Sequence, residues 1–403
     1  MKLSKVSQLV LVSAIGLLVA LSLSGCLIVT IDFLYVADSS GSGTSSPGQI
    51  QIYAVDSESG ALRPAATVVP SGGSKPVALA TTSDYANLYV ANQSNDTLVH
   101  FTIAGDGSLT QKDSVTLSFT PASIAVNQAN TYIYATGGAG PGELAVYPLS
   151  SGAIGALSSL TPLRVPGYST DDLIPTSVTT LPNNNAVYVT AFDQSAYFPG
   201  GTVTSSANPG WVFGFAVGSN GALTVASGSP YQAGVKPTSV AADPTNRFVY
   251  VTDFASNELI GYTVQNGTNL SFMLNGPFKT GSEPSAVIVD PRGLYIYTAD
   301  SLQNAVTAYS IALPTGTPSS LVGSVGGSGY STDTEPVSIL LDPALGRWLY
   351  TANYLGNSIS GLRLDPNSGT LSPDQATPFP TGSNPAAIAA IPHGNHNIQS
   401  VTP

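Results

Sequence analysis

Residues 237–253, PTSVAADPTNRFVYVTD, contain the two short phrases that recur along the whole chain. The later phrase is an apolar residue followed by Tyr, two small or β-branched residues and usually Asp or Asn. It begins at Leu34, Leu88, Ile133, Val187, Val249, Ile296 and Leu349. A recurrence every 45 to 62 residues is typical of a repeat architecture.

The earlier phrase is a Pro that opens an alternating apolar segment. It begins at Pro76, Pro121, Pro175, Pro237, Pro284, Pro336 and Pro385. No such Pro segment precedes the first Tyr motif, and no Tyr motif follows the last Pro segment. We therefore expect the C-terminal strand to pair with the N-terminal one and to close a ring without an unpaired sheet edge.

Each repeat reads as four strands, A to D, joined by short turns. In the fifth repeat we expect strands over 239–242, 248–253, 259–265 and 270–274, with turns at 243–246 and 266–267. This pattern predicts an all-β fold, a seven-bladed β-propeller of four-stranded blades over residues 31–392. A multi-sheet sandwich is the alternative, but it gives no reason for the sevenfold regularity.

The N-terminal segment reads as a targeting sequence. Lys2 and Lys5 precede an apolar stretch over 9–23 that is too short and wrongly flanked for a membrane span. The following residues 23–26, LSGC, resemble the lipobox of bacterial lipoproteins. This resemblance implies a signal peptide over 1–25, acylation of Cys26 (for example with palmitate) and a lipidated tether over 26–30. An ordinary secretory signal and an uncleaved anchor helix are the alternatives.

Composition excludes some partners. The chain of 403 residues has a formal net charge of −11, only 12 Lys and Arg residues and one Cys. So few basic residues form no patch for nucleic acid. Cys26 is the one cysteine, so the propeller has no disulfide. No dinucleotide, phosphate-loop or zinc-protease motif is present. We expect a monomer with no cofactor and no bound metal, and a C-terminal tail over 393–403.

Several phrases resemble the YVTN-repeat and lactonase-like seven-bladed propellers, a group that includes 6-phosphogluconolactonase. They are the Pro-opened strands, the turn DPRG at 290–293, the strand LYVAN at 88–92 and the turn GAL at 60–62. The resemblance covers essentially the whole mature chain and implies the propeller fold. It also implies that a lactonase would carry His and Arg just after the strand-A Pro.

The positions after each Pro differ from that lactonase pattern. One residue beyond Pro stand Val77, Ala122, Thr176, Thr238, Ser285, Val337 and Ala386. Two residues beyond Pro stand Ala78, Ser123, Ser177, Ser239, Ala286, Ser338 and Ala387. Opening a lactone needs a base or a polarising group beside the carbonyl. This departure therefore favours a non-catalytic protein.

The residue before each strand-A Pro is expected to ring the upper mouth of the channel, where the D–A and B–C loops meet. In order from the second blade these residues are Lys75, Thr120, Ile174, Lys236, Glu283, Glu335 and Asn384. Two Lys and two Glu predict a polar binding rim. The alternative is a set of solvated ion pairs around a water-filled channel.

Aromatic and acidic residues in the upper loops are further candidates for ligand binding. The D–A loops after the third and sixth blades share the phrase GYSTD, and the loop after the fourth blade contributes a Tyr. The long insertion in the fourth blade adds a Tyr and a Trp. The candidates are Tyr168, Asp171, Asp172, Tyr231, Tyr330, Asp333, Tyr197 and Trp211. Aromatic rings beside carboxylates can bind a sugar, and carboxylate oxygens can bind Ca²⁺. The alternative is that Asp and Tyr are ordinary loop residues, since Asp also caps turns.

The three histidines give weaker signals. His100 is expected to pack within a sheet, and His393 with His396 forms at most a weak metal pair, because a nearby carboxylate is lacking.

Taken together, the sequence predicts a lipid-anchored, extracytoplasmic binding module of the bacterial cell envelope, on the outer membrane in preference to the inner one. Its upper face would bind a protein or a carbohydrate-like ligand, because the short tether leaves from the lower face. One alternative is a lactonase-like hydrolase with a rearranged site, in which Lys75, Lys236, Glu283 and Glu335 are the titrating groups. Another is a structural envelope protein.

Overall fold

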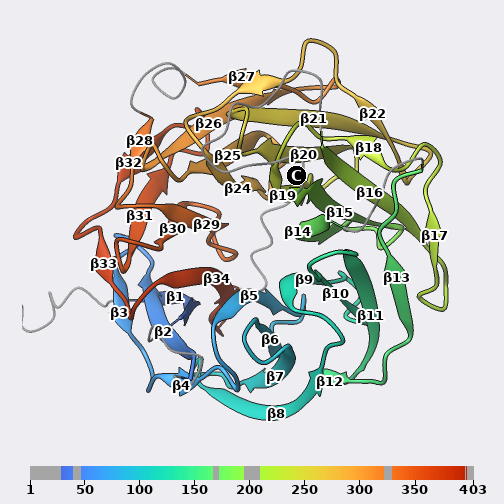
Figure 1. The fold of residues 1–403 in the computed structure, drawn as a ribbon. Coiled ribbons are helices and arrows are strands. Elements are labelled where there is room, and N and C mark those ends of the chain that lie inside the picture. Colours follow the sequence, from blue (N-terminus) through green and yellow to red (C-terminus); the bar gives the residue numbers. More distant parts are fainter. Residues whose placement is uncertain are drawn as a thin grey trace, which may run out of the picture.

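Seven antiparallel sheets surround a central axis in the computed structural model, which describes residues 29–39, 47–166, 172–194, 209–321, 329–394 and 396. Figure 1 shows the sheets arranged as blades around the axis. The predicted seven-bladed β-propeller is therefore confirmed. Within the described ranges, no helix has the length and apolar character that crossing a membrane requires.

Strand A of each blade lies nearest the axis. From blade 1 to blade 7 these strands are β34 (Pro385–Pro392), β5 (Pro76–Thr81), β9 (Pro121–Val126), β14 (Leu173–Thr180), β19 (Pro237–Ala242), β24 (Pro284–Val289) and β29 (Pro336–Leu341).

Strand B of each blade contains the Tyr motif. These strands are β1 (Thr30–Asp38), β6 (Asn87–Asn92), β10 (Tyr132–Gly137), β15 (Ala186–Asp193), β20 (Phe248–Asp253), β25 (Tyr295–Asp300) and β30 (Trp348–Asn353).

Strand C follows on the outer side of strand B. These strands are β2 (Gln49–Asp56), β7 (Thr97–Ile103), β11 (Glu143–Ser150), β16 (Gly210–Val217), β21 (Glu258–Gln265), β26 (Ala305–Ala312) and β31 (Ser358–Leu364).

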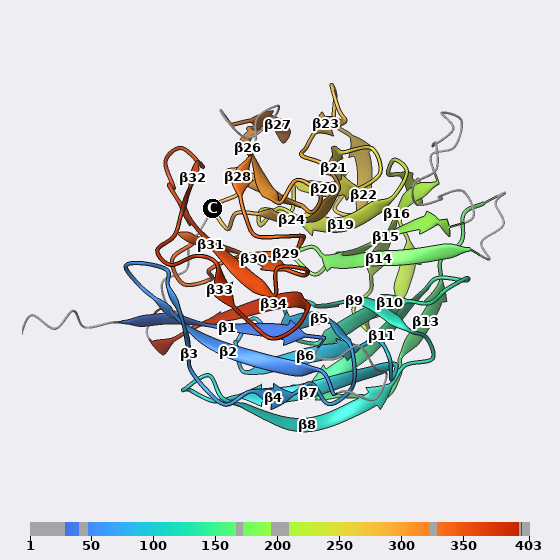
Figure 2. The ribbon, with the colours of Figure 1, turned by 60° about the vertical axis from the view of Figure 1, so that its left-hand side comes forward.

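The outermost strand differs from the prediction, because in six blades it is broken into two short pieces that both pair with strand C. The pieces are β3 (Leu62–Pro64) with β4 (Val69–Pro70), β12 (Ala153–Ile154) with β13 (Ser159–Pro162), β17 (Leu223–Val225) with β18 (Tyr231–Gln232), β22 (Asn269–Phe272) with β23 (Phe278–Lys279), β27 (Thr317–Ser320) with β28 (Tyr330–Ser331), and β32 (Leu371–Pro373) with β33 (Phe379–Pro380). Among the described residues, only blade 2 has a continuous outer strand, β8 (Leu109–Thr116). Figure 2 shows β8 at the periphery and β5 and β9 towards the axis.

A proline explains the break in several blades. In blade 5 the outer strand ends at Phe272, and pairing resumes at Phe278, directly after Pro277. Proline has no N–H to donate to a sheet, so it interrupts the ladder. The aromatic residue after it then packs against strand C, as Phe278 does opposite Leu259.

The ring closes as predicted. Strand β34 pairs antiparallel with β1, with Phe33 opposite Ile391 and Val36 opposite Ile388. The His393 N–H donates to the Ile31 carbonyl at 2.6 Å, and the His393 ring contacts Phe33 edge-on. Figure 1 shows red β34 beside blue β1. The last strand of the chain thus completes the first blade.

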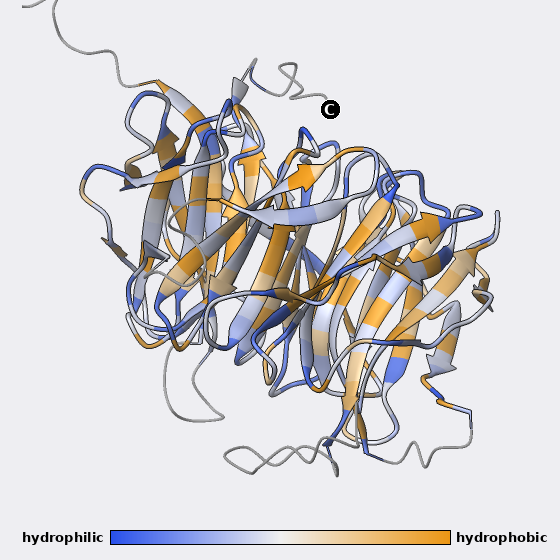
Figure 3. Ribbon diagram, turned by 90° about the horizontal axis from the view of Figure 1, so that it is seen from above, coloured by the Kyte–Doolittle hydropathy of each residue, from blue (hydrophilic) through white to orange (hydrophobic). Residues whose placement is uncertain are grey.

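The core lies between the blades. The buried apolar side chains of the described residues form seven clusters, and each cluster is shared by two neighbouring blades. In Figure 3 the strands are largely apolar within the disc, whereas the turns at its edges are hydrophilic. Because a single blade cannot cover its own apolar faces, each blade depends on its neighbours.

The tyrosine of the motif joins one blade to the next. Six of the seven motif tyrosines are buried and donate their hydroxyl to a carbonyl in the C–D turn of the following blade. The donors are Tyr35, Tyr89, Tyr188, Tyr250, Tyr297 and Tyr350, at 2.6–3.0 Å. Most acceptors are glycines with positive φ, such as Gly316 at 78°. We call these six hydrogen bonds tyrosine clasps. Each runs from one blade to the next in the same direction around the ring, and Tyr350 of blade 7 donates to Gly60 of blade 1.

Strand A carries a second set of links. The Oγ atoms of Ser123, Ser177, Ser239 and Ser338 each accept an N–H from strand A of the following blade, at 3.2–3.4 Å. The hydroxyls of Thr176, Thr238 and Ser285 donate to the strand-A Pro carbonyl of the following blade at 2.7–2.8 Å. The positions that lack catalytic side chains therefore hold neighbouring blades together.

Candidate functional site

The upper mouth is where the D–A loops enter strand A and the B–C loops leave strand B. In blades 5, 6 and 7 the first residue of each B–C loop donates its N–H to the residue before the strand-A Pro. Phe254 donates to the Lys236 carbonyl at 2.9 Å, Ser301 to Glu283 at 2.9 Å and Tyr354 to Glu335 at 2.8 Å.

The other end of each B–C loop reaches the next blade. The Glu283 N–H donates to Asn257 Oδ1 at 2.7 Å, Glu335 N–H to Asn304 Oδ1 at 2.8 Å and Asn384 N–H to Asn357 Oδ1 at 2.8 Å. The B–C loops over 254–257, 301–304 and 354–357 thus bridge four successive residues, Lys236, Glu283, Glu335 and Asn384. We call these four residues and three loops the upper rim.

The backbone of the rim is strained. Glu283, Glu335 and Asn384 have φ of 56°, 59° and 56°, in the left-handed region that favours glycine. Such a conformation costs about 1–3 kcal/mol per residue and persists only where the surroundings enforce it. Here the bridging asparagines supply that enforcement, so the loops hold both glutamates at fixed backbone positions.

The rim side chains influence one another electrostatically. Burial raises the pKa of Glu335, and the nearby Glu283 carboxylate raises it further. Burial lowers the pKa of Lys236, and Glu283 opposes this effect. The Lys236 ammonium lies 4.3 Å from the centre of the Phe254 ring and 5.7 Å from that of Phe192. Glu283, on the blade between them, therefore interacts electrostatically with both Lys236 and Glu335. The ligand role predicted for these three residues stays a prediction.

Lys236 is positioned by a buried carboxylate at the end of the Tyr motif, a position for which the sequence analysis predicts no functional role. Asp253, the last residue of the Tyr motif in blade 5, is buried and accepts the Val235 and Lys236 N–H groups, each at 2.9 Å. Gly234 has a φ of 72°, and a Cβ atom there would lie 2.0 Å from Asp253 Oδ2. Glycine is therefore required where this loop crosses the carboxylate.

The same motif position is occupied by buried acids in two other blades. Burial raises the pKa of Asp38 and of Asp300 to about 7. Thr298 and Thr307 donate their hydroxyls to the two oxygens of Asp300. The repetition of Asp or Asn at the end of the motif was the signal for this role, since such a residue can anchor the adjoining loop.

Two further members of the predicted rim, Lys75 and Asn384, are not among the groups that shift the pKa of Lys236 or Glu335. Lys75 is exposed on blade 2, where its φ is 56°. Asn384 donates its side-chain amide to the Tyr354 carbonyl at 3.1 Å. The ligand role predicted for both stays a prediction.

Of the predicted loop residues, Tyr231 and Tyr330 lie in the outer strands β18 and β28. They stand opposite strand C, where Phe278 and Phe379 stand in blades 5 and 7. The Tyr231 hydroxyl donates to the Ser227 carbonyl at 2.7 Å. Aromatic side chains thus recur at this position of the outer strand, and the ligand role predicted for both tyrosines stays a prediction.

Three other predicted residues have structural contacts. Trp211 is only 2% exposed and belongs to the core shared by blades 3 and 4. Asp333 accepts the Ser358 hydroxyl at 2.8 Å and the Thr334 N–H at 2.7 Å. Asp172 is exposed, and its carbonyl accepts the Gln194 N–H.

Four predicted residues cannot be placed. Cys26, Tyr168, Asp171 and Tyr197 lie outside the described residues. Their predicted roles in lipidation and ligand binding therefore stay predictions.

The described lining of the central channel contains no acidic, basic or histidine side chain. Its lining is Val, Ala, Leu, Ile, Ser and Thr from the seven inner strands, around a cavity of about 220 Å³. Most of its hydroxyl groups form the links between blades described above. His100 is also structural, since it lies within hydrogen-bonding distance of Asp113 and Asn87, at 2.8 Å each, and stacks on Tyr89.

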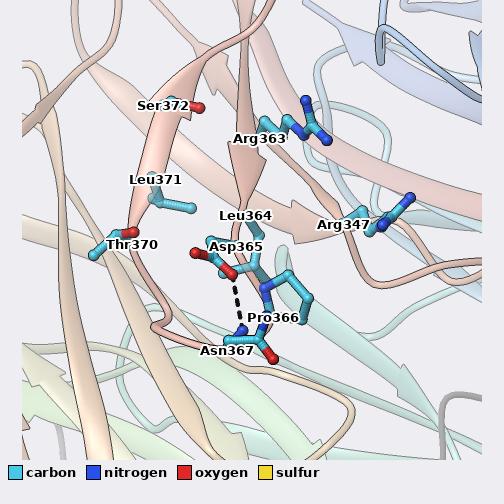
Figure 4. A pocket seen from close by; sticks show the side chains of 9 residues that line it. All are labelled: Arg347, Arg363, Leu364, Asp365, Pro366, Asn367, Thr370, Leu371 and Ser372. Carbon is cyan, nitrogen blue, oxygen red and sulfur yellow. Dashed lines mark hydrogen bonds between the residues drawn. The ribbon is translucent and has the colours of Figure 1, made fainter.

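A separate pocket of about 480 Å³ lies beside the β31–β32 turn of blade 7 (Figure 4). Its lining includes Arg347, Arg363 and Asp365. Hydrogen bonds from the Asn367 N–H and the Ser368 side chain lower the pKa of Asp365. With its lowered pKa, the Asp365 carboxylate stays ionised at neutral pH and is a weak base. This pocket therefore offers no general acid or base, and the upper rim remains the better candidate site.

Comparison with known proteins agrees with this architecture. The periplasmic gluconolactonase of Pseudomonas aeruginosa superposes with a TM-score of 0.71 at 17% identity, over 89% of this chain and 99% of that one. A candidate 6-phosphogluconolactonase from Bacteroides uniformis gives 0.71 at 17% identity, over 90% and 99%. A protein from Lactobacillus plantarum gives 0.71 at 16% identity, over 90% and 100%. At such identities the likeness shows the fold alone. No curated protein matches the chain.

The family is shown by the sequence of nearly the whole chain. Residues 13–129 and 39–398 match the family described as "Lactonase, 7-bladed beta-propeller". The predicted resemblance is therefore confirmed, and the chain belongs to the lactonase family of seven-bladed β-propellers.

Proposed function

We propose that the protein is a lactonase-type hydrolase whose reaction takes place at the upper rim. This was the alternative interpretation of the sequence, and family membership now favours it over a purely non-catalytic module. The observation that carries the proposal is that the bridging loops hold Lys236, Glu283 and Glu335 side by side on three successive blades through hydrogen bonds to their backbone. The electrostatic influence of Glu283 on the other two side chains supports it. A family-type His and Arg pair after the strand-A Pro is not needed if the rim supplies the base and the cation.

The chemistry assigns a role to each group. A carboxylate whose pKa is raised towards neutrality is a stronger base at working pH, which suits Glu335. Glu335 removes a proton from water, and the hydroxide forms a bond to the lactone carbonyl carbon. The carbonyl electron pair moves to oxygen, where the Lys236 ammonium stabilises the negative charge. The ring C–O bond then breaks, Glu335 returns the proton to the departing oxygen, and a hydroxy acid is released.

A variant pair tests the proposal. The purified protein is assayed with a panel of γ- and δ-lactones by titration of the released acid. Glu335→Gln should lower kcat/KM by roughly 100-fold or more, as loss of a general base does. Glu143→Gln is the matched control, because Glu143 begins strand C of blade 3. Absence of turnover by the unaltered protein, or equal activity of Glu335→Gln, would refute the proposal.

A non-catalytic binding module is the second candidate. It is favoured by the strand-A residues, whose hydroxyls are engaged between blades and do not face a reacting carbonyl. Under this alternative, a ligand would bind the rim, and Glu335→Gln would change its affinity while no lactone is consumed.

We also propose that the protein is anchored through an acylated Cys26. Strand β1 begins at Thr30 on the lower face, beside His393, and ends at Asp38 on the upper face. A tether attached below Thr30 would direct the upper rim away from the membrane. Labelled palmitate should enter the unaltered protein but not Cys26→Ser. Equal labelling of both proteins would refute the anchor.

A further inference from the structure

The upper rim carries little positive charge. Its segments over 234–237, 254–257, 281–284, 301–304, 333–336, 354–357 and 382–385 contain Lys236 as their one basic residue, together with Glu283, Glu335 and Asp333. A phosphate or carboxylate on a substrate would meet the carboxylates of Glu283, Glu335 and Asp333 and a single ammonium. Like charges at close range disfavour binding by several kcal/mol.

The rim also presents apolar side chains beside its glutamates. Leu302 is 65% exposed and Leu355 is 60% exposed. Leu302 lies in the loop that joins the Glu283 carbonyl to the Glu335 N–H, within two residues of both hydrogen bonds. Leu355 occupies the corresponding place in the loop that joins Glu335 to Asn384. Each glutamate is therefore adjacent in the structure to a solvent-exposed leucine.

Aromatic groups extend this apolar surface. Phe254 and Tyr354 begin two of the three bridging loops, and both are partly exposed. The Phe254 ring lies beside the Lys236 ammonium. The rim thus combines one cation, three carboxylates and four apolar or aromatic side chains on blades 5 to 7. A substrate that fits this surface has a polar reacting group and an uncharged, apolar remainder.

We infer that the rim selects a neutral lactone with an alkyl or aryl substituent and discriminates against phosphorylated or carboxylated sugar lactones. This inference rests on the proposed lactonase function. The carbonyl would lie between Lys236 and Glu335, and the substituent would lie against Leu302 and Leu355.

The first test compares substrates. We expect the kcat/KM for a δ-lactone with a pentyl substituent to exceed that for unsubstituted δ-valerolactone and for 6-phosphogluconolactone. A higher kcat/KM for the phosphorylated lactone, above all one that falls in Lys75→Gln, would overturn the inference while leaving the lactonase function intact.

The second test alters the leucines. The double variant Leu302→Asn/Leu355→Asn should raise KM for the pentyl lactone by roughly tenfold, the scale of a lost methylene contact or more. The loss of kcat/KM should be larger for the pentyl lactone than for δ-valerolactone, because only the pentyl substituent reaches the two leucines. Leu274→Asn is the control, because Leu274 is 83% exposed on the outer part of blade 5. An unchanged KM in the double variant would overturn the inference.

Binding of a non-hydrolysable analogue separates the two proposals. If no lactone is consumed, the lactonase function fails, and the selectivity of the rim is then measured with the pentyl-substituted δ-lactam by calorimetry. Binding that is weakened in the double variant supports an apolar site on the rim. Absence of binding, or equal binding by both proteins, overturns it.

Discussion

Asp300→Asn should remove a pH dependence from the stability of the propeller. Burial raises the pKa of Asp300 from its ordinary value of 3.8 to about 7. Between these values the folded protein keeps a proton that the unfolded chain has lost, so the free energy of unfolding falls as pH rises through this window. Each pKa unit corresponds to about 1.4 kcal/mol, and the full loss above pH 7 is therefore up to about 4 kcal/mol.

Asparagine should fit this site without strain, because blade 7 already has one there. Thr351 donates to Asn353 Oδ1 at 2.9 Å, and Asn353 Nδ2 donates to Ser360 Oγ at 2.9 Å. The hydroxyls of Thr298 and Thr307 occupy the corresponding positions around Asp300. The amide replaces a protonated acid at low pH and avoids a buried charge at high pH.

The assay is urea unfolding followed by tryptophan fluorescence between pH 4.5 and 8.5. The free energies of unfolding of Asp300→Asn and the unaltered protein should be similar near pH 4.5, and the variant should become the more stable one towards pH 7.5. The reciprocal variant Asn353→Asp adds a second buried acid. Its free energy of unfolding should therefore fall more steeply with rising pH than that of the unaltered protein. Parallel pH profiles for Asp300→Asn and the unaltered protein would refute the reasoning.

Three further outcomes are expected. Tyr250→Phe leaves the Gly316 carbonyl without its donor, and should lower the free energy of unfolding by about 1–3 kcal/mol; an unchanged urea midpoint would count against the tyrosine clasps. Ala286→Ser places a hydroxyl where other blades have a serine that accepts an N–H from the next blade, and should raise stability by about 0.5–1.5 kcal/mol; a lower Tm would contradict this. Glu283→Gln removes a cause of the raised pKa of Glu335, so the acid limb of the pH–rate profile should move to lower pH; an unmoved limb would show that Glu335 is not the base.

The blades could be predicted from the sequence because their signals are local and repeat. The Tyr motif, the Pro-opened strand and the turn residues mark strands A, B and C, and for blade 5 the predicted strand over 248–253 is the observed β20. Ring closure followed from the unpaired first and last segments. The broken outer strand was missed because its pieces are two to four residues long, although Pro277 followed by an aromatic residue was a usable signal.

Contacts between blades were not predictable in the same way. The hydroxyl of Tyr250 meets a carbonyl 66 residues away, and the distance between those groups depends on how the blades pack. The rim residues were identified by their place before Pro, but the coupling of Lys236 to Glu283, and of Glu283 to Glu335, required knowledge of which blades are adjacent and how deeply each side chain is buried.

The pairing of β1 with β34 makes the choice of first blade arbitrary. Asp32 lies opposite Pro392, so the two ends of the ring are neighbours in space. A short covalent linker could join them, and the polypeptide could then be opened in a loop between any two other blades. Such a circularly permuted chain would have the same seven interfaces between blades, and the order in which the ribosome makes the blades would change while the architecture stays the same.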